Sequence, residues 1–296
     1  MAQSHILVGA GEGVAEPTIR RIGPADLMSA LAKGLDDFSA TPSHALFLCV
    51  IYPVVGLLLA GLTLGFAIIP LLYPLAAGFA LIGPIAALGL YELSRRREAG
   101  VPVSALDALD VLHSPSIGAI VALGVLLMIV FAIWIAIAHA IYVANCGYAQ
   151  PTSAGQFIHD VLFTPAGWNL IVYGNLVGLV FAAAVLAISA VSFPLLLDRD
   201  AGAVVAVLTS VRAIRANPVA MTLWGLIVAA LLFVGSLPLF LGLPVVLPVL
   251  GHATWHLYRK VVEPDPNPHP RYRPQPRGPR YAADFPAVLF PWARER

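Results

Sequence analysis

The chain has 296 residues, of which 59% are hydrophobic and only 11% are charged, and its formal net charge is +1. Its mean hydropathy is +0.85, whereas about a quarter of the residues in an ordinary soluble domain are charged. This composition excludes a soluble globular enzyme and a nucleic-acid-binding protein, and it indicates a membrane protein.

Four long segments contain no Asp, Glu, Lys or Arg: residues 38–91, 111–159, 161–197 and 216–258. Because about 20 apolar residues of helix cross the hydrocarbon of a bilayer, these segments have room for six crossings. The predicted spans are residues 44–66, 69–91, 117–144, 168–194, 218–236 and 239–260. Residues 145–167 form an excursion between the third and fourth spans.

A polar residue followed by proline marks the predicted start of three spans, at Thr41-Pro42, Ser114-Pro115 and Asn217-Pro218. The polar side chain can cap a new helix, and proline is well tolerated at its first position. A short amphipathic segment precedes each pair. Such segments suit helices in the membrane interface, although connecting helices packed on the bundle explain them equally well.

Each amphipathic segment is expected to gather its apolar side chains on one face. The expected faces are Leu27, Leu31, Leu35 and Phe38; Leu106, Leu109 and Leu112; and Val204, Val207, Leu208, Val211 and Ile214. In the second segment, Ser104 and Asp107 have the spacing of a capping box.

The predicted fold is therefore an all-α membrane protein with six transmembrane helices in three hairpins, each preceded by a short amphipathic interfacial helix. We expect a flexible N-terminal tail over residues 1–19, the six-span domain over 20–262 and a Pro/Arg-rich tail over 263–296. Repeated units of this kind are common in transporter folds, but short apolar repeats also arise by chance.

The positive charges predict the orientation of the chain. In the six-span topology all 17 Lys and Arg lie on the same side as both termini, and Asp160 is the formal charge on the other side. By the positive-inside rule, both termini are expected in the cytoplasm.

The C-terminal tail contains nine prolines and six arginines but ends in an apolar stretch that includes Phe285, Leu289, Phe290 and Trp292. Proline-rich chain is extended or disordered, whereas this apolar end is unusual for a solvated tail. We expect it to dock on a partner or to return to the membrane interface.

Charged residues border two predicted spans on the cytoplasmic side. They are Glu92, Arg95, Arg96 and Arg97 after the second span, and Asp198 and Arg199 after the fourth. Each group is a candidate contact for anionic lipid or a partner, and the alternative is a simple topological anchor.

His252 and His256 lie four residues apart and so share one face of the last predicted span. They could ligate haem or a metal, but neutral histidines near helix ends also bond to backbone or headgroups. We predict no cofactor and no metal, and the absence of a catalytic motif predicts that the protein is not an enzyme. Cys49 and Cys146 are expected in opposite halves of the membrane, so no disulfide is predicted.

Four stretches resemble an uncharacterised family of bacterial integral membrane proteins: Gly78-Phe-Ala-Leu-Ile-Gly83-Pro84, Gly89-Leu-Tyr-Glu-Leu-Ser-Arg-Arg96, Pro194-Leu-Leu-Leu-Asp-Arg199 and Ala216-Asn-Pro218. The resemblance covers about residues 20–262 and implies a multi-pass protein of the bacterial inner membrane. Some members have been labelled cytochrome c oxidases, but this chain lacks enough intramembrane histidines for two haems and copper.

Two classes of function remain open. The spans contain no charged residue that could carry an ion, which favours an accessory or assembly component of a membrane complex, including a respiratory one. The repeats and the prolines in the second and last spans favour a small-molecule transporter or channel. A membrane enzyme or lipid-handling protein is the least favoured class. The expected partners are membrane lipids and either a membrane protein or further copies of the chain.

Overall fold

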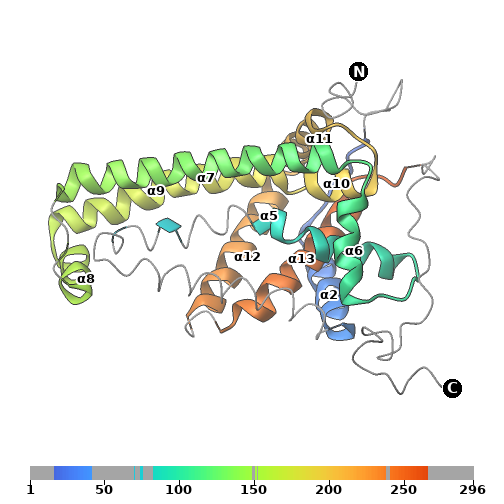
Figure 1. Cartoon of the computed structure of the whole chain (residues 1–296), viewed down its shortest axis with the longest axis horizontal. Coiled ribbons are helices and arrows are strands. Elements are labelled where there is room, and N and C mark those ends of the chain that lie inside the picture. The colour runs from blue at the N-terminus through green and yellow to red at the C-terminus, as the bar shows by residue number, and fades with distance from the viewer. Residues whose placement is uncertain are drawn as a thin grey trace, which may run out of the picture.

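The computed structural model describes residues 17–41, 70, 74–75, 83–148, 151, 153–237 and 241–265. Two of the longest apolar runs form the two longest helices, α7 (Ile117–Cys146) and α9 (Pro165–Ser189). These helices lie side by side and project away from the remaining elements (Figure 1). The elements near the base of this hairpin form a second group, which we call the head.

The head contains the amphipathic segments and the end of the last helix. Its elements are α2 (Pro24–Ala40), α5 (Gly83–Ala86), α6 (Leu88–Glu98), the 3₁₀ helix η2 (Ala105–His113), α10 (Ser192–Asp198), α11 (Ala203–Ala216) and α13 (Leu243–Val261). The long apolar helix α12 (Pro218–Ser236) follows α11 and packs against α13. Helix α8 (Ala154–Phe163) lies at the far end of the α7–α9 hairpin (Figure 1). The expected excursion over residues 145–167 is therefore partly helical, and the Ser153 hydroxyl accepts a hydrogen bond from Gln156 N–H at its start.

Three of the predicted spans correspond to helices that are long and apolar enough to cross a membrane. These helices are Ile117–Cys146, the nearly continuous run Pro165–Asp198 and Pro218–Ser236. The predicted span 44–66 lies outside the described residues, and 69–91 is described only in part. Six spans in three hairpins thus remain a prediction.

Helix α13 is not among these three apolar helices, although residues 239–260 were predicted as a span. Its C-terminal half contains His252, His256, Arg259 and Lys260, and it packs against α2 and α6 within the protein. Polar contacts from these neighbours replace the uniformly apolar surroundings that a lipid-facing helix requires.

The predicted apolar face of α2 is only partly buried: Leu27 is inside, and Leu31 and Phe38 pack partly buried against the core. Helix α2 buries Leu27, Ala30, Gly34 and Asp37, whereas Leu35 is exposed. Small residues are selected because the backbones of α2 and α13 approach closely: a Cβ built on Gly34 would lie 2.6 Å from the backbone nitrogen of Ala253. Close helix approach thus outweighs the burial of larger side chains.

The other two amphipathic segments follow the same rule. Helix α11 buries Ala203, Ala206, Thr209, Ser210 and Ala213, whereas Val204 and Leu208 of the predicted apolar stripe are exposed. In η2 the buried residues are Asp107, Ala108 and Val111, and the three leucines point outward. Three residues per 3₁₀ turn align Leu106, Leu109 and Leu112 in one exposed row. The outward apolar faces are compatible with interfacial helices.

Asn217 does not cap the following helix, contrary to the prediction. Its Oδ1 accepts a hydrogen bond from Ile22 N–H at 2.8 Å, and its Nδ2 donates to the Arg20 carbonyl at 3.0 Å. The same N-terminal stretch forms an antiparallel bridge between Ile19 and Val262, with Arg20 N–H donating to the Val261 carbonyl at 2.7 Å. Asn217 thus ties residues 20–22 to the junction of α11 and α12, and the Ile19–Val262 bridge ties the same stretch to the end of α13.

The approach of α2 to α13 gives a stability prediction. Gly34→Ala should lower the free energy of unfolding by about 1–3 kcal/mol, because overpacking forces two backbones apart. Thermal unfolding in mild detergent measures the effect. Gly23→Ala is the matched control, since a Cβ there meets no atom within 4 Å. Equal melting temperatures for the two variants would contradict the packing argument.

Helix α8 provides a test of the orientation. A cysteine at Asp160 should react with a membrane-impermeant thiol reagent added to the outside of intact cells, whereas cysteines at Lys33 and Arg212 should react only after permeabilisation. The background should lack Cys49 and Cys146. Labelling of Lys33→Cys in intact cells would contradict the predicted topology.

Candidate functional site

Five polar side chains from three helices meet at the centre of the head. Asp37 lies in the last turn of α2, Ser94 and Arg97 lie one turn apart on α6, and His252 and His256 lie one turn apart on α13. We call this group the Asp37 hub. The i, i+3 and i, i+4 spacings place both members of each helical pair on the face toward Asp37.

The Asp37 carboxylate is the centre of this hydrogen-bonded cluster. Its Oδ2 lies 2.6 Å from Ser94 Oγ and 2.8 Å from His256 Nε2. Its Oδ1 accepts a hydrogen bond from Arg97 Nη1 at 3.0 Å. Ser94 Oγ also lies 2.7 Å from His252 Nδ1, so a continuous chain of contacts runs from His256 to His252.

These donors favour the ionised form of Asp37. Burial alone raises the pKa of this carboxyl group, but the hydrogen bonds from His256 and Ser94 outweigh burial and hold the pKa below its ordinary value. The nearby Arg97 guanidinium supplies a compensating positive charge, and Arg97 also donates to Asp36 Oδ2 at 2.9 Å. The hub therefore joins α2, α6 and α13 through a compensated buried charge.

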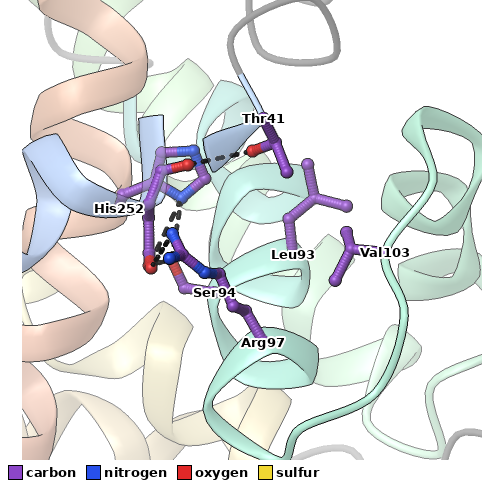
Figure 2. Close-up of a pocket in the computed structure, with 7 residues that line it drawn as sticks. Thr41, Leu93, Ser94, Arg97, Val103 and His252 are labelled. Carbon is purple, nitrogen blue, oxygen red and sulfur yellow. Dashed lines mark hydrogen bonds and ion pairs between the residues drawn. The ribbon is translucent and has the colours of Figure 1, made fainter. Parts of the chain in front are cut away.

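A small recess adjoins the hub. Asp37, Thr41, Leu93, Ser94, Arg97, Val103 and His252 line it. Figure 2 shows Ser94, Arg97 and His252 converging on one side, with Leu93 and Val103 opposite. The recess is partly open to solvent, and it has no space wide enough to hold a water molecule. His252 Nε2 is buried and has no hydrogen-bond partner among the described residues.

A second buried cluster, the Glu92 network, joins α6 to η2. Glu92 is fully buried and accepts hydrogen bonds from Arg95 Nη2 at 2.8 Å and Arg96 Nε at 2.7 Å. Arg96 also pairs with Asp107 at 3.2 Å and with Asp110. Burial lowers the pKa of Arg96, but the three carboxylates raise it overall, so the guanidinium stays charged. Asp107 also accepts from Ser104 N–H at 2.7 Å, as the predicted capping box requires.

A third polar cluster ties α13 to α6 and α10. The Tyr258 hydroxyl donates to Asp198 at 2.6 Å, and Arg259 lies 3.6 Å from the same carboxylate. Arg259 Nε and Trp255 Nε1 donate to Glu98 at 3.1 and 2.9 Å. Arg199 donates to the Glu263 carbonyl beyond the end of α13.

The candidate residues from sequence thus lie in three different clusters. Glu92, Arg95 and Arg96 bind one another, Arg97, His252 and His256 belong to the hub, and Asp198 and Arg199 contact the end of α13. The buried side chains of Glu92 and Arg96 face protein, so a lipid or partner can contact this group only through its more exposed members. Phe285, Phe290 and Trp292 lie outside the described residues.

Sequence reasoning missed Asp37 and Ser94. Asp37 was not considered as a candidate, and Ser94 was noted only as part of the stretch Gly89–Arg96 that resembles the family. The spacing of His252 and His256 was the available signal, because two histidines on one face of a buried helix need polar partners. Over the part of the chain that the structure describes, no group of three or more His, Cys, Asp or Glu is arranged to hold a metal ion.

Three long apolar helices and a head with buried, compensated charges define a helical integral membrane protein. The family model described as "Predicted integral membrane protein (DUF2189)", a family of unknown function, matches residues 71–198, which confirms the family resemblance. The matched residues include the Glu92 network, whereas Asp37, His252 and His256 lie outside them. No curated protein and no solved structure matches the chain.

The Glu92 network gives a stability prediction. Glu92→Gln should cost about 3–5 kcal/mol of unfolding free energy, because Arg95 and Arg96 lose the fully buried carboxylate that they share. Glu263→Gln is the matched control: its pair with Arg20 at 3.4 Å is about half exposed on both sides and should contribute at most about 1 kcal/mol. Chemical or thermal unfolding in detergent compares them, and equal losses would contradict a structural role for Glu92.

Proposed function

We propose that the protein is a non-enzymatic accessory or assembly component of a membrane protein complex, and that α9 contacts a helix of the partner. The observation that carries this proposal is an exposed asparagine on a membrane-spanning helix. Asn175 lies near the middle of α9, its side chain is exposed, and its Nδ2 donates to the Ile171 carbonyl at 2.7 Å.

In membranes, amide side chains on spanning helices hydrogen-bond across helix interfaces, and an exposed Asn175 is positioned for such a contact. The neighbouring Gly174 strengthens the case, because a Cβ built there meets no atom within 4 Å. A partner helix could therefore approach the α9 backbone closely at this point. Leu176, Leu179 and Val180 extend the exposed apolar surface along the same helix.

The buried charges of the head also support a structural role. In the Glu92 network and the Asp37 hub the charges bind one another across α2, α6, η2 and α13, which stabilises the helix arrangement. Helices α7, α9 and α12 contain no Asp, Glu, Lys or Arg, although carriers of ions usually need an embedded charge.

Co-purification tests this function. The wild-type protein, extracted from native membranes in mild detergent, should bring down a stoichiometric membrane-protein partner detectable by mass spectrometry. Asn175→Leu should reduce the recovered partner at least tenfold. Asn145→Leu is the matched control, because Asn145 near the end of α7 makes the same bond to a carbonyl four residues earlier.

A small-molecule transporter is the competing proposal, since a water-lined path could also solvate Asn175. Two results together would favour transport over the accessory function. The wild-type protein would purify without a partner, and it would carry solute into reconstituted vesicles in a way that Asn175→Leu abolishes.

A further inference from the structure

His252 is a buried histidine with an unused ring nitrogen. The residue is 1% exposed, and its Nε2 and Arg199 Nε are the two buried side-chain polar atoms without a hydrogen-bond partner among the described residues. Such atoms are rare in native proteins, because a buried polar group without a partner is destabilising. His252 also lines the recess beside the hub.

The hydrogen-bond chain determines which nitrogen of His252 carries the proton. Asp37 is ionised and can only accept, so the single hydroxyl proton of Ser94 points to Asp37 Oδ2, 2.6 Å away. Ser94 Oγ must then accept a hydrogen bond from His252 Nδ1–H across 2.7 Å. In the neutral ring, Nε2 consequently carries a lone pair.

We propose that His252 Nε2 is a proton-binding site, and that proton uptake there releases the hub as a latch between α2, α6 and α13. One proton from water adds to the lone pair, the ring becomes a cation, and no other covalent bond changes. Because this inference rests on the hub alone, it is independent of any partner at Asn175.

The groups around His252 explain why proton uptake by its ring is coupled to the separation of α6 from α13. Asp37 Oδ2 lies 4.0 Å from His252 Nδ1, but Arg97 and His256 already compensate this carboxylate at 3.0 and 2.8 Å. Nε2 makes no hydrogen bond to a described residue in the closed hub, the Leu90 carbonyl is the backbone group that interacts with the ring, and the recess has no space wide enough for water. The charged ring is therefore solvated only if α6 and the segment around Val103 separate from α13.

Nitrogen NMR of ¹⁵N-histidine-labelled, full-length protein in detergent or nanodiscs tests the site directly. At neutral pH, His252 should carry its proton on Nδ1, and its proton affinity should be at least tenfold below that of His113, whose side chain is 81% exposed. Ser94→Ala should abolish the tautomer preference. Ser189→Ala is the control, because that buried hydroxyl bonds only to the Val185 carbonyl in its own helix.

Thermal unfolding between pH 7 and pH 5 tests the latch. The melting temperature of the wild type should fall on acidification, because the unfolded chain binds the proton more tightly than the closed hub does. His252→Gln should weaken this fall, and His113→Gln should leave it unchanged.

A proton on Nε2 at neutral pH, an affinity equal to that of His113, or an identical fall in wild type and His252→Gln would overturn the proposal. If His252→Gln does not fold, the wild-type NMR measurement decides alone.

Discussion

The head depends on the compensation of buried charge. A carboxylate removed from water is strongly destabilising unless donors surround it, and Asp37 obtains three donors from two other helices. The same requirement places Glu92 against Arg95 and Arg96. Because hydrogen bonds are directional, these contacts define both the spacing and the register of α2, α6 and α13. The apolar contacts alone would permit many similar packings.

Close backbone approach is the second constraint, and it determines which positions of α2 are glycine or alanine. Where α2 meets α13, Ala30 and Gly34 let the backbones approach and Leu27 is buried beside them, whereas Leu35 is exposed. Exposing Leu35 gives up part of the roughly 1.5–3 kcal/mol that burial of a large apolar side chain contributes. The face that is buried instead gains backbone packing at Gly34 and the polar contacts of Asp37.

The sequence predicted the helices better than their contacts. The spans at 117–144 and 218–236 agree closely with α7 and α12, because long charge-free runs have one plausible conformation in a membrane. The buried faces of α2 and α11 could not be predicted by hydrophobic periodicity, which assumes that large apolar residues point inward. The hub was missed since its members lie up to 219 positions apart, and no local pattern links Asp37 to His256.

This separation has a consequence for biogenesis. Helix α2 is synthesised before α13, which supplies His252 and His256, and the three long apolar helices of the described residues lie between them in the chain. Chains generally begin to fold while they are being synthesised, from the N-terminus onward. Until α13 emerges, Asp37 lacks both histidines, and Ile19 lacks its bridge partner Val262. The head is therefore a late assembly product, and a chain truncated before α13 carries an N-terminal helix without its main packing surface.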